Sequence, residues 1–213
     1  TLQLFTQVTG FEVAHGRLQG VQTRQGTLQA GVVVLTTGAW TRQLGLSLGL
    51  DWDVRYVHGQ ACVTERVEPV LRNHFSSAAF FETQSEESTG AAVLAMSQSL
   101  NGNFLLGEAV NPTPDFLPHA GATGLQAIAG QIARYFPQLR HLRVLRTWEA
   151  PVAFTADGLP LLGPVADLPG LILATSFRST VIVTPLVGKL VAQLVTQGRC
   201  YLDIGKFLPD RWR

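Results

Sequence analysis

The chain has 213 residues and a net charge of +1, with 46% hydrophobic and 15% charged residues. This apolar content is enough for a real core, in one large domain or two small ones. Nucleic-acid binding is not expected, because 16 basic residues stand against 15 acidic ones without a basic excess. No transmembrane segment is expected either, because the longest apolar runs, Gly31–Leu35 and Val181–Val187, fall far short of the ~20 residues that span a bilayer.

The two cysteines, Cys62 and Cys200, are far apart and form no CxxC pattern, so a zinc-type metal site is not expected. A Cys62–Cys200 disulfide is the alternative to two free buried thiols, and the thiols are preferred. The chain begins with Thr1 and shows no signal-peptide pattern. We therefore expect a cytoplasmic protein, with membrane association through a partner as the alternative, whose true amino terminus lies elsewhere.

The first 35 residues have the pattern of β structure, beginning with a strand at Leu2–Phe5. Hairpin turns are expected at Gly16 and at Gln25–Gly26, between runs of period two. Val32–Leu35 is an unbroken β-branched run, typical of a strand buried on both faces of a parallel sheet. It leads into Thr36–Thr41, a glycine-containing turn with a short helix, where backbone amides can meet an anion. A purely steric use of that glycine is the alternative.

The middle of the chain is rich in expected strands. Candidates are Val54–Val57, Gln60–Thr64, Val93–Met96 and Phe104–Leu106, and residues 86–90 have the composition of an exposed loop. Asn101–Gly102 is a hairpin signal between the last two of these strands. Residues 123–136 are expected to be helical, because Leu125, Ile128, Ile132 and Phe136 recur at helical spacing. Pro137 should end that helix.

The carboxyl-terminal part should return to the sheet and finish on a helix. A strand is expected at Val144–Val152, a turn at Asp157–Pro160 in which Asp157 bonds its own backbone, and a short buried strand at Leu171–Thr175. A helix is expected from Pro185 to about Gln197, since proline is tolerated in a first helical turn.

Three segments in this order resemble the D-amino-acid oxidase-like flavoproteins. They are Val32–Trp40 (VVVLTTGAW), Thr155–Pro164 (TADGLPLLGP) and Leu171–Pro185 followed by Gly188–Val191. His58-Gly59-Gln60 with Thr64-Glu65 is similar to the strand that leads into the substrate domain of that family. The resemblance runs from Leu4 to Arg211. The family includes glycine oxidase, sarcosine oxidase, D-amino-acid dehydrogenase, the opine and hydroxyproline dehydrogenases, and the flavin subunit of hydrogen cyanide synthase.

The resemblance implies a mixed α/β fold with two lobes. Residues 1–48 and 148–213 would form an incomplete FAD-binding lobe, and residues 49–147 a substrate or partner lobe with an antiparallel sheet. The implied activity is oxidation of the C–N bond of an amino acid or secondary amine, by hydride transfer from carbon to non-covalently bound FAD. The cofactor carries that chemistry, so no catalytic acid or base is named.

The resemblance also implies roles for particular residues. Val8 would hold the adenine through its backbone, and Thr37, Gly38 and Trp40 would lie near the phosphate and ribose. The loop of Arg178, Ser179, Thr180, Val181 and Ile182 would face the flavin ring, where a helix start and the charge of Arg178 would favour an anionic flavin. Arg178 and His58 would contact substrate, although a structural role is the plainer interpretation of His58. A surface Glu149 beside a core Trp148 is expected.

Several positions depart from the family pattern. These 213 residues contain no Gly-x-Gly-x-x-Gly fingerprint, so either a partner subunit or a missing amino-terminal half would supply it. The Arg that binds a substrate carboxylate in glycine oxidase-like members falls at Val152, and the assisting Tyr near Ala95. The Cys that attaches flavin in sarcosine oxidases falls near Ala150, against covalent attachment. Val152, Ala95, Thr175 and Thr180 favour the alternative of a non-catalytic scaffold or partner subunit. A plain α/β domain that shares turns with flavoproteins is the third interpretation.

Overall fold

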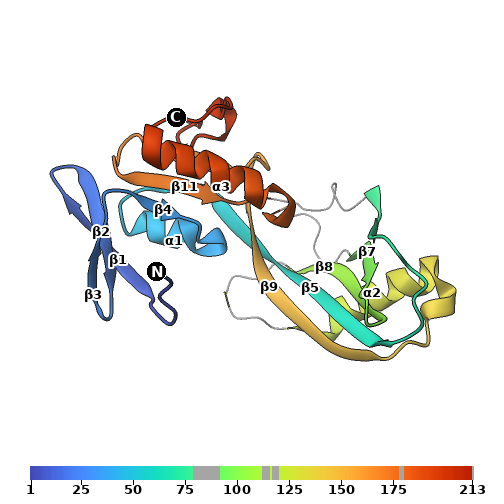
Figure 1. Cartoon of the computed structure of the whole chain (residues 1–213). Coiled ribbons are helices and arrows are strands. Elements are labelled where there is room, and N and C mark those ends of the chain that lie inside the picture. Colours follow the sequence, from blue (N-terminus) through green and yellow to red (C-terminus); the bar gives the residue numbers. More distant parts are fainter. Residues whose placement is uncertain (79–91, 112–115, 117–119, 178–179, 213) are drawn as a thin grey trace. The chain divides into compact units, whose positions relative to one another are not determined.

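In the computed structural model the chain divides into two compact units, residues 1–55 with 153–213 (unit 1) and residues 56–152 (unit 2). The structure describes residues 1–78, 92–111, 116, 120–177 and 180–212, without the side chain of Thr180. The elements are drawn in Figure 1. No helix of the described residues is long and apolar enough to cross a membrane.

Unit 1 holds two small sheets and the helices beside them. Its elements are β1 (Val8–Ala14), β2 (Arg17–Thr23), β3 (Gly26–Gln29), β4 (Val33–Leu35), a 3-10 turn (Gly38–Trp40), α1 (Thr41–Leu46), β10 (Leu161–Pro164), β11 (Leu171–Thr175), α3 (Thr180–Gln197) and a last 3-10 turn (Gly205–Phe207).

The strands β1, β2 and β3 form an antiparallel sheet whose turns lie at Gly16 and before Gly26, as predicted. The first seven residues contain no strand, so the prediction of one at Leu2–Phe5 is wrong. Phe5 has a φ of 56° and lies in a turn. Its side chain is 99% exposed, which means that the apolar character of this segment is not used for packing within the described residues.

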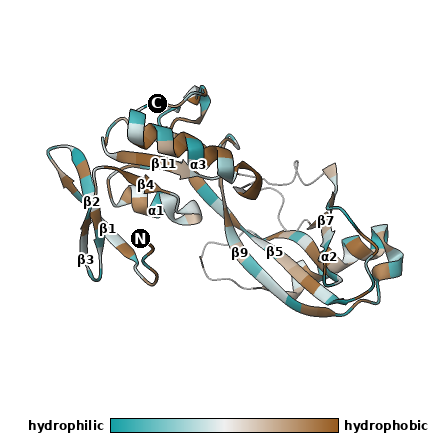
Figure 2. Ribbon diagram, viewed as in Figure 1, coloured by the Kyte–Doolittle hydropathy of each residue, from teal (hydrophilic) through white to brown (hydrophobic). Residues whose placement is uncertain are grey.

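The second sheet has the order β10-β11-β4, and β11 runs parallel to β4. All five residues of β11 are buried, which confirms the prediction of a short buried strand at Leu171–Thr175. In β4, which was predicted to be buried on both faces, Val33 and Val34 are half-buried and only Leu35 is buried. Leu171 and Leu173 face a core with Leu35, while Ala174 faces the other side, against Leu190 of α3. Figure 2 accordingly shows β11 as strongly hydrophobic, with α3 alongside it.

Helix α3 begins five residues earlier than the sequence predicts. Pro185 lies inside it rather than at its start. A proline inside a helix lacks a backbone donor and its ring crowds the carbonyl four residues earlier, here that of Val181, yet helical backbone precedes Pro185. The apolar run before the proline thus belongs to the helix, and Val181 and Ile182 stand exposed on its first turn.

Unit 2 is a five-stranded sheet with one helix packed on it. The strand order is β6-β7-β8-β5-β9, and its elements are β5 (Val54–Arg66, which begins in unit 1), β6 (Phe75–Ser76), β7 (Ala92–Gln98), β8 (Asn103–Asn111), α2 (Ala122–Tyr135), a 3-10 turn (Pro137–Leu139) and β9 (Val144–Thr155, which ends in unit 1). The two short strands expected within residues 54–64 are one long strand. The hairpin at Asn101–Gly102 is confirmed, between β7 and β8.

Helix α2 covers one face of this sheet, and no described helix of unit 2 packs on the opposite face, which is called here the open face. Ile128 and Ile132 of the helix pack with Phe104 and Cys62 from the strands. Cys62 is a free and buried thiol, as predicted, and Cys200 is also free but only half-buried. Burial raises the pKa of the Cys62 thiol to about 11, so it stays protonated at neutral pH.

Candidate functional site

The strongest candidate for a binding site in unit 1 lies where its two parallel strands end. Residues Thr36–Trp40 follow β4, and Thr175 ends β11, after which come Ser176 and the start of α3. In open α/β sheets, ligands bind outside the carboxyl ends of such strands. A helix that begins there also directs its free backbone N–H groups and positive end toward the ligand.

The turn after β4 has the open backbone that a close ligand contact needs. Gly38 has a φ of +53°, and a Cβ placed on it would meet no atom within 4 Å. The adjacent hydroxyls form a chain, with 3.0 Å between the Oγ1 atoms of Thr37 and Thr41 and 3.1 Å between those of Thr41 and Thr175. This chain ties the turn to the end of β11. Trp40, on the same turn, is 46% exposed.

The end of β11 carries a strained residue with an unused polar atom. Ser176 has a φ of +61°, and its Oγ is buried without a hydrogen-bond partner among the described residues. A buried hydroxyl without a partner costs free energy, so such a group points to an absent ligand or water. Val181 and Ile182 then present apolar side chains on the first turn of α3, 85% and 81% exposed.

The structure does not place four of the predicted cofactor contacts in this cluster. Arg178 and Ser179 lie outside the described residues, and of Thr180 only the helical backbone is described. Val8 belongs to a different sheet, as the first residue of β1, where it pairs with Thr23. Thr37, Gly38, Trp40, Val181 and Ile182 are the predicted contacts that flank the ends of β4 and β11.

Unit 2 buries a polar cluster on the face of the sheet that α2 covers. His58 and Glu149 have side chains 1% and 2% exposed, and 3.4 Å separates His58 Nδ1 from Glu149 Oε1. The amide of Asn111 donates to the same carboxylate oxygen at 3.2 Å. Gln60 donates to Thr147 Oγ1 and to the carbonyl of Gly121, both at 3.0 Å. These bonds join three strands, β5, β8 and β9, to the residue before α2. Neither ring nitrogen of His58 has a hydrogen-bond partner among the described residues.

The prediction of a core Trp148 and a surface Glu149 is wrong, because the two residues have the opposite exposure. Glu149 is 8% exposed and Trp148 41% exposed. Neighbouring residues of a strand face opposite sides of the sheet, and α2 covers the side of Glu149. The sequence alone did not show which side the helix would cover.

The open face of the same sheet holds a carboxyl group that sequence reasoning missed. Glu108 Oε1 would lie 3.4 Å from a Cβ placed on Gly59, and Val152 Cγ2 would lie 3.2 Å from the same point. Burial raises the pKa of Glu108 above its ordinary value. The one sequence feature that could have indicated it is that Glu108 is a single acidic residue in the otherwise apolar pattern of its strand.

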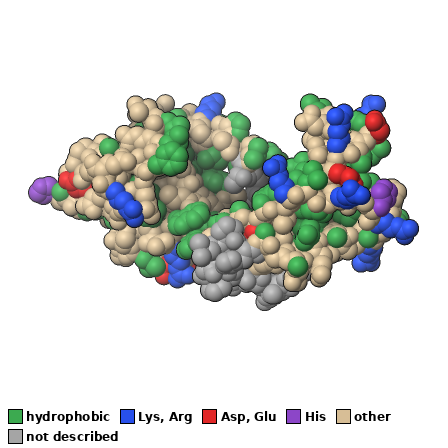
Figure 3. All heavy atoms as spheres, turned by 90° about the horizontal axis from the view of Figure 1, so that it is seen from below, with side chains coloured by type: hydrophobic (Ala, Val, Ile, Leu, Met, Phe, Trp, Pro, Cys, Tyr) green, Lys and Arg blue, Asp and Glu red, His purple; other side chains and the backbone are tan. Residues whose placement is uncertain are grey.

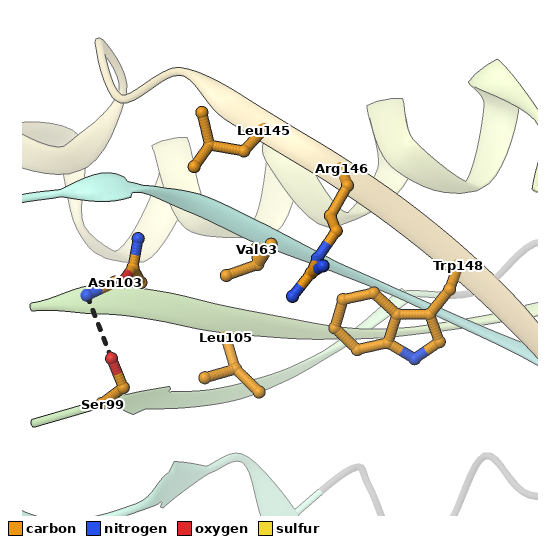
Figure 4. A pocket seen from close by; sticks show the side chains of 7 residues that line it. All are labelled: Val63, Ser99, Asn103, Leu105, Leu145, Arg146 and Trp148. Carbon is orange, nitrogen blue, oxygen red and sulfur yellow. Dashed lines mark hydrogen bonds between the residues drawn. The ribbon is translucent and has the colours of Figure 1, made fainter. Parts of the chain in front are cut away.

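Farther along this face lies a cavity of about 360 Å³. Figure 4 shows Arg146 and Trp148 projecting over it from β9, with Val63 and Leu105 beneath. Figure 3 shows one side of the molecule, on which basic side chains are scattered among acidic and apolar ones. Across the described ranges, no three His, Cys, Asp or Glu residues come together in a group that could hold a metal ion.

Comparison with known proteins connects these features to one family. The family model described as FAD dependent oxidoreductase (DAO) matches residues 2–194. Hydrogen cyanide synthase subunit HcnC of Pseudomonas aeruginosa is 28% identical over 98% of this chain and 47% of its own length. Glycine oxidase of Pseudomonas putida is 27% identical over 99% of this chain and 54% of its own length. The chain therefore spans about half the length of these relatives.

Solved structures agree with the fold. L-Proline dehydrogenase from P. horikoshii and glycine oxidase from Geobacillus kaustophilus each have a TM-score of 0.83 and 25% identity. Each superposes on 98% of this chain, and the chain covers 54% and 52% of them, respectively.

The residues after β4 and β11 fit the cofactor that the family name prints. The unpartnered hydroxyl of Ser176 and the free space at Gly38 suit a polar phosphate or sugar group, and the exposed Val181 and Ile182 suit a flat apolar ring. The cofactor is FAD, held without a covalent bond. The match over residues 2–194 shows that this chain belongs to the DAO family of FAD-dependent oxidoreductases.

Proposed function

We propose that the protein oxidises the C–N bond of an amino acid or a secondary amine, with FAD as the acceptor of the hydride. The observation that carries the proposal is the pair of parallel strand ends in unit 1, where Ser176 leaves a buried hydroxyl without a partner in the described chain. This is the place at which an α/β sheet receives a ligand, and it lies within the part of the chain that matches the family.

In this proposal FAD supplies the electron sink, and the chain supplies binding and charge. Gly38 lets the backbone come close to the cofactor, because it carries no side chain and has positive φ. The first turn of α3 offers backbone N–H groups and the positive end of an 18-residue helix, which stabilise negative charge on a reduced cofactor. Val181 and Ile182 exclude water beside it.

In this proposal the two units bind different molecules. We assign cofactor binding to unit 1 and substrate binding to the open face of the unit 2 sheet, in keeping with the lobes that the resemblance implies. Substrate contact by Arg178 and by His58 stays a prediction. His58 is 1% exposed on the covered face, so it would act through its neighbours rather than at the open surface.

A heteromeric assembly is part of the proposal. One relative is named as a subunit of hydrogen cyanide synthase, and another, from Nostoc sp., as a bifunctional ThiO/ThiG protein. The first name is that of a subunit and the second that of a fused protein, so a partner chain for this protein is a reasonable expectation.

A non-catalytic scaffold or partner subunit is the second candidate. It is favoured by Val152 and Ala95, which stand where the resemblance puts a carboxylate-binding Arg and its Tyr. Under this alternative the protein keeps the fold and does not turn over amines.

Two measurements on the purified protein that carries this chain separate the candidates. The first is FAD affinity, followed by flavin fluorescence. Ser176→Ala should weaken FAD binding, while Ser47→Ala, at an exposed hydroxyl that bonds only the carbonyl of Leu44 among the described residues, should not. The second is anaerobic reduction of the flavin by glycine, proline and N-methylated amino acids. FAD binding without reduction by any amine supports the scaffold, and equal FAD affinity in both serine variants contradicts the assigned site.

A further inference from the structure

Glu108 lies on the open face of the unit 2 sheet, the face opposite α2. Its carboxyl and the side chain of Val152 both border the space above Gly59, where a Cβ would stand 3.4 Å from Glu108 Oε1 and 3.2 Å from Val152 Cγ2. His58 and Gln60, the neighbours of Gly59 in β5, turn to the covered face and are buried there. Glu108 is therefore separate from the buried polar cluster.

The carboxyl group of Glu108 has no partner among the described residues. Within the described part of the chain it makes no hydrogen bond and no ion pair, although it is half-buried. Burial also raises its pKa. By contrast, Glu149 on the covered face accepts from Asn111 and lies 3.4 Å from His58.

The surroundings of Glu108 leave room beside it. Along β5 the open face presents Gly59 and Ala61, and along β8 it presents Gly107, whose added Cβ would meet only the methyl of Ala61, at 3.6 Å. Val152 adds an apolar wall. A desolvated carboxylate on an apolar, small-residue floor is stabilised most by a ligand that brings the opposite charge.

We propose that Glu108 binds a positively charged group of the substrate, a second nitrogen distinct from the one that is oxidised, so that the protein prefers diamines and amines with cationic side chains. The inference rests on the proposed function, which makes this face the substrate platform. The same inference accounts for the apolar side chain of Val152 at this position. An apolar residue beside a carboxyl suits a cationic alkyl chain, and it offers nothing to a substrate carboxylate.

The test compares two ligands that differ by one charged nitrogen, 1,4-diaminobutane and butylamine. Their affinities for the FAD-loaded protein are measured anaerobically by calorimetry, in wild type and in Glu108→Gln. Loss of one charge-assisted contact should raise the Kd of 1,4-diaminobutane about tenfold or more and leave that of butylamine unchanged. The matched control is Glu68→Gln, because Glu68 is exposed in the same unit and only its backbone carbonyl receives a hydrogen bond among the described residues.

A second variant guards against a merely structural effect. Glu108→Lys should abolish binding of 1,4-diaminobutane and improve binding of 4-aminobutanoate, which carries a carboxylate in place of the second ammonium. Equal affinities for the diamine in wild type and Glu108→Gln would overturn the inference, as would a wild type that binds neither amine.

Failure of the inference and failure of the proposed function give different results. Flavin that is reduced by amines with no effect of Glu108 on the diamine leaves the function standing and removes the inference. Diamine binding that depends on Glu108, in a protein whose flavin no amine reduces, supports the inference and removes the oxidation.

Discussion

Arg211 closes the turn that carries the Asp-Gly-Leu-Pro segment, and its removal should destabilise unit 1. Its Nε and Nη2 donate to the two carboxylate oxygens of Asp157 at 2.7 and 2.9 Å. The guanidinium also donates to the carbonyl oxygens of Leu159 and Pro160 at 2.9 and 3.2 Å. Arg211 is 9% exposed and Asp157 31% exposed, so water replaces little of this network.

The expected cost of Arg211→Met follows from these contacts. A bidentate pair with one largely buried partner, together with carbonyls left without a donor, is worth about 2–4 kcal/mol. For a chain of this size that loss lowers Tm by roughly 6–12 °C. The matched control is Arg42→Met, because Arg42 makes a similar two-pronged pair with Asp51 but both side chains are about half exposed. Exposed pairs contribute about 0–1 kcal/mol.

The assay is urea unfolding of wild type, both Arg→Met variants, Asp157→Asn and the Arg211/Asp157 double variant. The pair lowers the pKa of Asp157 well below its ordinary value of 3.8, through the hydrogen bond with Arg211 first. A lowered carboxyl pKa stabilises the fold above the unfolded value and stops doing so as pH falls toward the folded one. The difference between wild type and Arg211→Met should therefore shrink below about pH 4. Equal urea midpoints at pH 7, or a loss that stays constant down to pH 2, would refute the reasoning.

Three further predictions concern unit 2. Gly102→Ala should cost about 2 kcal/mol or more, since Gly102 has a φ of +91° and an added Cβ would collide with the carbonyl oxygen of Val67; an unchanged Tm would contradict this. Glu149→Leu should cost about 1 kcal/mol or more in urea unfolding, because it removes the carboxylate acceptor of the half-buried Asn111 amide, which keeps only a bond of 3.4 Å to Gln60 Oε1; a midpoint equal to that of wild type would show that the cluster does not stabilise the unit. Glu108→Gln should flatten the pH dependence of stability, measured by urea midpoints from pH 4 to 8. Burial raises the pKa of Glu108, so the wild type loses stability as pH rises from the ordinary value of 4.5 through the raised one. A variant less stable than wild type at pH 7 would count against this assignment.

Local signals in the sequence predicted most of the sheets. Period-two runs and the Asn101–Gly102 dipeptide gave the hairpins, and the β-branched run before Thr36 gave the parallel strand. The start of α3 differs from the prediction because proline favours the first turn of a helix, whereas here the apolar residues before Pro185 are already helical. Such boundaries depend on packing, which local preference does not contain.

The candidate site was less predictable, because it depends on contacts between distant segments. Thr41 and Thr175 are 134 positions apart and share a hydrogen bond. The position of Glu108 on the open face depends on the pairing of β8 with β5 and on the packing of α2 against the other face, and local sequence shows neither. The pairing of Arg211 with Asp157 depends on how the last residues of the chain fold back onto that turn, which the sequence alone does not show.

The measurement that tests the central claim most directly is the visible absorption spectrum of the purified, FAD-loaded protein, recorded anaerobically during titration with amines and amino acids. The account predicts that at least one such compound bleaches the flavin band, with release of the matching carbonyl product. A protein that binds FAD and keeps its oxidised spectrum with every amine and amino acid would contradict amine oxidation and leave a scaffold in its place.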